Sequence, residues 1–370
     1  MAGPGAPGRC GVAGRPAAPA LAPAPVPARP RGVSPVRVAA AAAGLLGRLW
    51  LHEVRAGDLD AIDAAGGLGA ALPGRGPGDL TDLAVEYHRL FIAGIPPYES
   101  VFLDPSAMLG TPATARVVAC YRAAGWSPPP DARAAAADHL GLELLALANA
   151  SEAGRDGGAA HALRCAHLAL WAPVFVLAVR TAAPHPFYRA LADRTCALVL
   201  DGLPMGAWPA GVDPLPALPA PPVYAASGDD PRPPADAAPA DDPAPGDPGP
   251  GDADAGPSLP AVVRRLAAPR EAGLFLTPDA IADLGRSLDL PVLIGERRRM
   301  LSALFQAAGQ YDHVPALLDA LVARWDAAAM ETVDVARACP AWQPVATAWL
   351  ARLARTRTLL RALAAEAADA

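Results

Sequence analysis

The sequence predicts an all-α protein, in which a helical bundle is followed by an acidic linker and a second, smaller helical module. Its composition is 52% hydrophobic but only 5% aromatic, which favours helices with breakers over sheets. No stretch shows the sustained alternation of apolar and polar residues that marks a half-buried strand. Clusters of Gly and Pro instead interrupt a helical apolar pattern repeatedly, so successive helices joined by short turns are expected.

Shifts in composition divide the chain into four parts. Residues 1–36 are Pro, Ala, Gly and Arg with little to bury, and we expect a disordered leader. Residues 37–203 carry the helical pattern of the first domain. Residues 204–257 are rich in Pro, Ala and Asp, which predicts an extended acidic linker. Helical patterning resumes over 258–370, the second module, to which no chemistry can be assigned.

Two apolar stretches of the first domain lack the features of membrane segments. Residues 31–51 are better explained as an amphipathic first helix than as a signal peptide, because the apolar run is short and Arg48 interrupts its end. Residues 165–179 would span only about 22 Å as a helix and contain Pro173. We therefore expect no stable membrane insertion and a cytoplasmic location.

The stretch from Asp79 to Asp104 organises the first domain. It begins as a helix with one apolar face, formed by Leu83, Tyr87, Leu90 and Phe91. Gly94 is expected to end this helix in a left-handed conformation. The following Ile95-Pro96-Pro97 forces an extended path, so residues 98–104 are expected on a stiff loop. Such a loop can present a binding surface. A Pro-punctuated turn between two core helices is the alternative.

A second stretch, residues 136–150, places His139 and Glu143 one helical turn apart. This spacing is typical of a surface hydrogen bond, although a general acid/base pair is conceivable. Two ligands are too few for a metal site. Farther along, His161 and Cys165 share a helical face while His167 points elsewhere, so core packing is favoured over metal binding there too. We therefore expect no metal site.

Composition and motifs also exclude several classes of function. The formal charge of −6 argues against a nucleic-acid-binding protein. The five cysteines are scattered and never form a CxxC pair, which fits a reducing compartment without structural zinc. Nucleotide-binding glycine patterns, a GxSxG elbow and HExxH are all missing. The residues therefore indicate a protein that is not an enzyme and needs no cofactor.

The second module is predicted to hold a series of helices. Thr277-Pro278 is a strong helix start, with a cap followed by Pro in the first turn. Another helix follows Glu296, with Met300, Leu301, Leu304 and Phe305 facing inward. A third runs from 315 through 325. The last begins near Gln343 and carries an apolar stripe made of Val345, Trp349, Leu353, Leu360 and Leu363.

Five short motifs, in order, give residues 38–203 a resemblance to a known family. They are Glu86-Tyr87-x-x-Leu90-Phe91, Pro96-Pro97-Tyr98-Glu99-Ser100-Val101, Asp138-His139-Leu140-Gly141-Leu142-Glu143, His167-Leu168-x-x-Trp171-x-Pro173-x-Phe175 and Pro186-Phe187-Tyr188-Arg189-Ala190-Leu191-Ala192. Together they resemble the TorD-like chaperones, which mature molybdenum-cofactor oxidoreductases. The resemblance does not extend to residues 258–370.

The resemblance implies an all-α cytoplasmic chaperone that binds an apo-molybdoenzyme, through its twin-arginine leader, and supports cofactor insertion before export or assembly. A leader needs carboxylates for its two arginines and an apolar groove for its helix. The residues expected to bind it are Glu86, Tyr87, Leu90, Phe91, Pro97, Tyr98, Glu99, Ser100, Val101, Asp138, His139 and Glu143. His139 is expected to make binding pH-sensitive near neutrality. A homodimer is left open.

We further expect residues 96–104 and the helix start at Asp138-His139 to face each other across the client groove. Two alternatives remain for the function. One is a structural assembly subunit that stays with a cytoplasmic oxidoreductase. The other, less favoured, is an uncharacterised enzyme that uses His139 and Glu143.

Overall fold

A computed structural model describes residues 35–65, 67–152, 158–208, 213–216 and 258–369. The all-α prediction is confirmed: these residues form helices and contain no strand, and a single antiparallel bridge joins Tyr98 and His139. The predicted leader up to residue 34 and the predicted linker at 209–212 and 217–257 lie outside the described residues.

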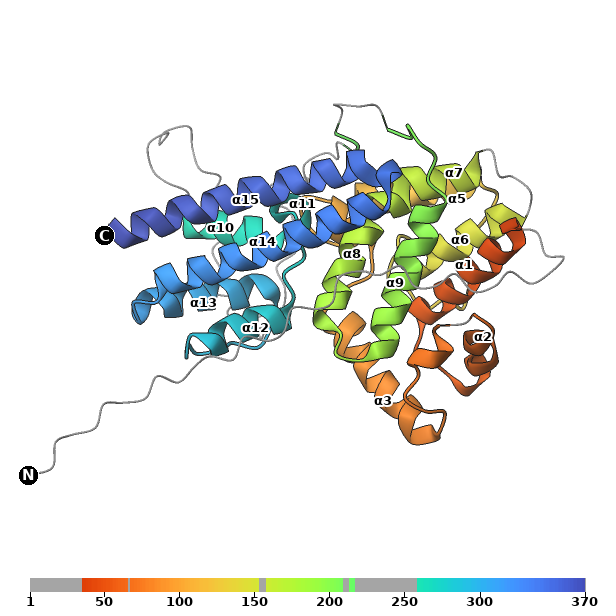
Figure 1. Ribbon diagram of the computed structural model, residues 1–370, viewed down its shortest axis with the longest axis horizontal. Helices are drawn as coiled ribbons and strands as arrows, with labels where there is room; N and C mark the ends of the chain where they lie inside the picture. The colour runs from red at the N-terminus through yellow and green to blue at the C-terminus, as the bar shows by residue number, and fades with distance from the viewer. Residues whose placement is uncertain (1–34, 66, 153–157, 209–212, 217–257, 370) are drawn as a thin grey trace, which may run out of the picture.

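The first helical unit extends from α1 to α9 (Figure 1). Its elements are α1 (Pro35–Leu51), η1 (Ala56–Asp58), α2 (Leu59–Ala64), η2 (Gly69–Ala71), α3 (Pro77–Tyr87), η3 (His88–Ile92), α4 (Glu99–Leu103), α5 (Pro112–Ala123), α6 (Leu140–Glu152), α7 (Ala159–Leu163), η4 (Arg164–Leu168), α8 (Ala169–Ala182) and α9 (Pro186–Asp201). Two of the short elements, η3 and η4, are π-helical turns.

Helices α1 and α6 pack closely because glycines face each other where they meet. A Cβ atom on Gly47 would lie 2.8 Å from the carbonyl oxygen of Gly141, and a Cβ atom on Gly141 would lie 2.5 Å from the carbonyl oxygen of Gly47. No side chain fits at such distances, so only glycine permits this crossing. Trp50 of α1 is also buried, and its indole donates to Thr195 Oγ1 on α9 at 2.9 Å.

The second helical unit is built from α10 to α15. Its elements are α10 (Leu259–Ala267), α11 (Pro269–Ala272), α12 (Pro278–Ser287), α13 (Arg297–Gln310), α14 (Val314–Ala338), η5 (Pro340–Trp342) and α15 (Gln343–Asp369). The predicted helix start at Thr277 is confirmed, because its hydroxyl accepts from the N–H of Ala280 at 3.0 Å. The inward face predicted for α13 is also buried.

The long helices α14 and α15 run side by side from the second unit to the first (Figure 1). The apolar stripe of α15 therefore enters two cores. Val345 and Trp349 belong to the core of the first unit, whereas Leu353 and Leu360 belong to the core of the second. Trp349 donates its indole N–H to the carbonyl oxygen of Leu170 at 2.8 Å.

Further contacts join the two units on the side of α4. Phe275 stacks on Phe102 with ring centroids 5.5 Å apart, and the guanidinium of Arg297 lies over the Phe275 ring. Arg270 donates to the carbonyl oxygen of Leu103 at 2.6 Å. Within the predicted linker, Leu215 is buried against the first unit. The second unit is thus packed firmly onto the first.

The helical run 159–182, made of α7, η4 and α8, is long and apolar enough to cross a membrane by length and composition. However, 78% of its most apolar window is buried inside the protein. The buried residues of α8, among them Trp171 and Phe175, form the centre of the first core. The run therefore has the placement of a core helix.

Candidate functional site

The apolar residues predicted to bind a client on α3 and η3 lie inside the protein. Tyr87, Leu90 and Phe91 are buried, and Tyr87 donates its hydroxyl to the carbonyl oxygen of Trp50 at 2.9 Å. Phe91 packs edge-on against Trp50 with centroids 5.0 Å apart. These side chains therefore hold α3 against α1 and offer no exposed surface.

The helix end at Gly94 differs from the expectation. Gly94 does not adopt a positive φ angle, so the predicted left-handed conformation is wrong. A π-helical turn ends the helix instead, with the N–H of Ile95 donating to the carbonyl oxygen of Leu90 at 2.6 Å. A Cβ atom on Gly94 would lie 2.7 Å from that carbonyl oxygen. Glycine is needed here for space and not for handedness.

Tyr98 has an extended backbone, and its N–H donates to the carbonyl oxygen of Pro96 at 3.0 Å. The stiff loop expected over 98–104 is wrong, because Glu99–Leu103 form the short helix α4. The expected groove between this segment and Asp138 is also wrong, because the two segments bond to each other directly. The N–H of Glu99 donates to the carbonyl oxygen of Asp138 at 3.0 Å, and the N–H of Leu140 donates to that of Pro97 at 2.8 Å. These bonds fix the start of α4 to the start of α6.

Asp138 is fully buried and ties α4 to α5. Its carboxylate accepts from the N–H of Ser100 at 2.7 Å and from the hydroxyl of Thr114 at 2.9 Å. The bond to Ser100 satisfies a backbone donor in the first turn of α4, which no residue of that helix could satisfy. Asp138 therefore acts as an end cap supplied from elsewhere in the chain.

Glu99 is also fully buried and forms a charged pair. Its two oxygens accept from Nδ1 of His167 at 2.8 Å and from the guanidinium of Arg116 at 3.3 Å. Burial opposes the charged form of His167, but the charge of Glu99, together with the Cys120 thiol and the hydrogen bond to Glu99, outweighs burial and raises the pKa of His167 to about 9. His167 is thus a cation at neutral pH.

Glu143, one turn into α6, has no hydrogen-bond partner for either carboxylate oxygen among the described residues. Burial, followed by the charges of Glu99 and Asp138, raises the pKa of Glu143 well above its ordinary value, although the indole of Trp171 opposes the shift. These surroundings favour the protonated carboxyl group of Glu143 over the carboxylate. The protonated form adds no negative charge next to Glu99 and Asp138.

His139 is buried and neutral. Its Nδ1 accepts from the N–H of Gly141 at 3.0 Å, and its ring meets Tyr98 edge-on with centroids 4.9 Å apart. Burial lowers the pKa of His139 to about 3. The expectation of a surface pair with Glu143 is wrong because both side chains are buried, and titration of His139 near neutrality is excluded by its low pKa.

Most of the predicted client-binding residues thus form the interior of the first unit. The buried ones are Tyr87, Leu90, Phe91, Pro97, Glu99, Ser100, Val101, Asp138, His139 and Glu143. Only Glu86 and Tyr98 are half-buried. Glu86 accepts two hydrogen bonds from Arg89, at 2.8 and 2.9 Å, and Arg89 also pairs with Asp279 of α12. Glu86, Arg89 and Asp279 thus form an ion-pair network that joins the two units.

The sequence reasoning missed the outer face of α3 and η3. Val85 and Ile92 are 64% and 67% exposed, two turns apart on the side opposite the buried stripe. Between them lies His88, whose ring contacts Glu53 at 2.7 Å. The signal that could have identified this face was the presence of apolar residues outside the buried stripe of an amphipathic helix.

No group of three or more metal-ligating side chains occurs among the residues that the structure describes. His161 Nδ1 lies 3.7 Å from the Cys165 sulfur, and His167 points to Glu99 instead, as expected from their spacing. Cys165 and His167 are buried, but the core packing expected for His161 is wrong because its side chain is exposed.

Residues 57–177 match the family model described as Nitrate reductase delta subunit. This match is consistent with the resemblance of residues 38–203 to the TorD-like chaperones. The match contains every residue predicted to bind a client, from Glu86 to Glu143. No curated protein matches the chain. The TorD-like family is one of chaperones for the maturation of nitrate-reductase-type molybdoenzymes and not of catalysts.

Proposed function

We propose that the protein is a cytoplasmic chaperone that binds an apo-molybdoenzyme through its twin-arginine leader and releases it after cofactor insertion. The observation that carries this proposal is the match of residues 57–177 to a family of molybdoenzyme maturation chaperones. The interior of the matched region supports it as well, since His139 and Glu143 are buried and offer no accessible catalytic pair.

The client surface that we propose is the outer face of α3 and η3. Val85 and Ile92 would contact the apolar helix of the leader, and Glu86 would contact its arginines together with Asp279. Arg89 pairs with both acids, so an arginine of the leader would either displace it or share these carboxylates with it. The buried residues of the predicted site, from Tyr87 to Glu143, would hold this surface in place without touching the leader.

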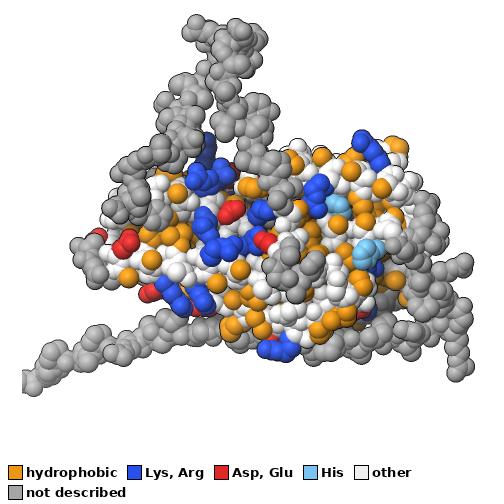
Figure 2. All heavy atoms as spheres, turned by 90° about the horizontal axis from the view of Figure 1, so that it is seen from above, with side chains coloured by type: hydrophobic (Ala, Val, Ile, Leu, Met, Phe, Trp, Pro, Cys, Tyr) orange, Lys and Arg blue, Asp and Glu red, His pale blue; other side chains and the backbone are white. Residues whose placement is uncertain are grey.

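Charge supports this choice of face. Figure 2 views the molecule from above, whereas α3 lies at the bottom of Figure 1, and the middle of the face that Figure 2 shows carries many Arg side chains with fewer acids among them. A leader that carries two arginines would be repelled by such a face. The acids beside α3 would instead speed encounter and select the partner, while apolar burial would supply most of the affinity.

Titration of the full chain with a fluorescent twin-arginine leader peptide tests the proposal. The double change Val85→Ser and Ile92→Ser should weaken binding about tenfold or more, because it removes two exposed apolar contacts. Met330→Ser on α14, where Met330 is 66% exposed, is the matched control and should bind like the parent. If no leader peptide binds and the chain instead stays stoichiometric with the mature enzyme, the protein is a structural assembly subunit.

A further inference from the structure

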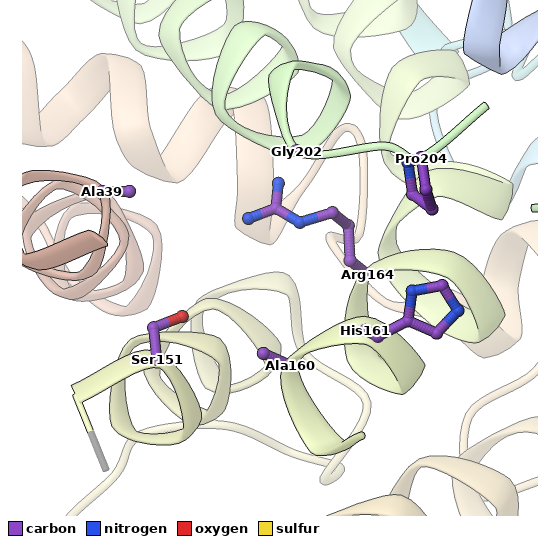
Figure 3. A pocket seen from close by; sticks show the side chains of 7 residues that line it. All are labelled: Ala39, Ser151, Ala160, His161, Arg164, Gly202 and Pro204. Carbon is purple, nitrogen blue, oxygen red and sulfur yellow. The ribbon is translucent and has the colours of Figure 1, made fainter. Parts of the chain in front are cut away.

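A pocket separate from the proposed client surface lies where α1, α6, α7 and the end of α9 meet (Figure 3). Its volume is about 280 Å³, and it opens to solvent. The lining residues are Ala39, Ser151, Ala160, His161, Arg164, Gly202 and Pro204. Small side chains form most of its walls, so Arg164 and the polar groups of Ser151 and His161 decide what it can bind.

The guanidinium of Arg164 is held in this pocket in a fixed position. One of its nitrogens, Nη1, donates to the carbonyl oxygens of Leu198 and Val199, the latter at 3.0 Å. Both carbonyls belong to the last turn of α9, where helical carbonyls lack partners of their own. Arg164 itself begins the π-helical turn η4, a kind of element that occurs often at functional sites.

The other two nitrogens of Arg164, Nε and Nη2, have no hydrogen-bond partner among the described residues, and no carboxylate of those residues lies within ion-pair distance of it. Burial lowers the pKa of Arg164, although the charges of Cys165 and Asp201 oppose this shift. Partly buried cations without an anionic partner are costly. The Nε–Nη2 edge is the fork that binds two oxygens of an oxyanion side by side.

Gly202 provides the room for this arrangement. A Cβ atom at Gly202 would lie 2.3 Å from the central carbon of the guanidinium and 2.5 Å from Nε. Any other residue at the end of α9 would therefore push Arg164 out of its position. In Figure 3 the guanidinium lies between Gly202 and the side of the pocket that carries Ser151, and the ring of His161 lies toward Pro204.

We propose that this pocket binds a small oxyanion, the phosphate or carboxylate group of a small molecule. The free edge of Arg164 would bind two of its oxygens, and the hydroxyl of Ser151 would donate to a third or contact the body of the molecule. The walls made by Ala39 and Ala160 leave space beside the anion for a few further atoms. This site is independent of the client surface and of the chaperone function proposed above.

The test uses the full chain and inorganic phosphate, with chloride at matched ionic strength as the reference. Phosphate should raise the melting temperature in a saturable manner, and calorimetric titration should give a single site. Arg164→Gln should weaken phosphate binding at least tenfold. Ser151→Asp should abolish it, because the new carboxylate would itself occupy the free edge of Arg164, and this variant remains informative if Arg164→Gln fails to fold.

Arg194→Gln is the matched control, since Arg194 also donates to a backbone carbonyl, that of Ala65, but lines no part of this pocket. It should bind phosphate like the parent. Glycerol 3-phosphate and citrate then distinguish phosphate from carboxylate ligands, and saturable binding of either that Ser151→Asp abolishes supports the oxyanion site. The proposal is overturned if phosphate, glycerol 3-phosphate and citrate all leave the parent unaffected, or if Ser151→Asp binds them as the parent does.

Discussion

The indole N–H of Trp342 donates to the carbonyl oxygen of Ala169 at 2.8 Å, and this carbonyl is the one that Pro173 leaves without a helical donor. In a regular helix the N–H of residue 173 would bond to the carbonyl of residue 169, but proline has no N–H. Trp342 is fully buried and lies in η5, immediately before α15. The second unit thus completes a hydrogen bond that the central helix of the first unit cannot make by itself.

This relationship predicts a coupling between the two residues. Trp342→Phe should lower the free energy of unfolding by ~1–3 kcal/mol, because it leaves the buried carbonyl of Ala169 without a donor. In a Pro173→Ala background the same change should cost less, because the alanine introduced there supplies a helical N–H. Urea unfolding of the parent, the two single variants and the double variant measures the difference as a double-mutant cycle. Equal costs of Trp342→Phe in both backgrounds would contradict the interpretation.

The positions of the helices could be predicted well from the sequence, but the elements against which they pack could not. Caps such as Thr277 and stripes such as that of α15 are local patterns, and local physics decides them. Periodicity shows that a face is buried but not against what, so the division of the α15 stripe between two cores could not be foreseen. The same limit applies to the carbonyl of Ala169 that Pro173 leaves free, whose partner lies 173 residues away in the chain.

The candidate site was misjudged for a related reason. Carboxylates are almost always exposed unless paired, so Glu99 and Asp138 were expected at the surface. Their partners are Thr114, Arg116 and His167, which come from α5 and η4 and could not be matched to them from spacing alone. The structure brings the motif residues of these two segments together, but it places them inside the fold.

Asp138→Ala should therefore destabilise the protein strongly. It removes the acceptor for the buried N–H of Ser100 and for the hydroxyl of Thr114, and we expect a loss of ~2–4 kcal/mol. Thr114→Val removes one of the two partners only and should cost less. Urea unfolding of both variants tests the order of these effects. A cost for Asp138→Ala within ~1 kcal/mol, as for a surface change, would show that the cap is not formed in solution.

The pair of His167 and Glu99 predicts an alkaline loss of stability. Because folding raises the pKa of His167 to about 9, its contribution is fully present below the ordinary histidine pKa of about 6.5 and is lost as the pH rises through about 9. The contribution is on the order of 3 kcal/mol. Urea unfolding between pH 6 and pH 10 should show this decline in the parent and a weaker one in His167→Gln. Identical slopes in the two proteins would rule out a charged His167.

The raised pKa of Glu143 predicts that its neutral counterpart, glutamine, makes the protein more stable near neutral pH. The folded state raises the pKa of Glu143, so the carboxyl group must take up a proton on folding once the pH exceeds its ordinary pKa of about 4.5. Glu143→Gln removes this cost, and the variant should gain stability over the parent as the pH rises from about 4.5 toward neutrality. Below that pH the two proteins should differ little, because Glu143 is then protonated in both states.

The matched control for this change is Glu99→Gln, because Glu99 is equally buried but is paired with His167 and Arg116. The same neutralisation should lower stability at pH 7 there, since it leaves two cations without their carboxylate. Urea unfolding at pH 4 and pH 7 compares the two variants. At pH 7 Glu143→Gln should raise the free energy of unfolding and Glu99→Gln should lower it, because the first carboxyl group is protonated and the second is ionised. If Glu143→Gln instead destabilises the protein at pH 7, as Glu99→Gln does, then Glu143 is an ionised and paired carboxylate. The cluster would then carry one more negative charge than its hydrogen bonds indicate.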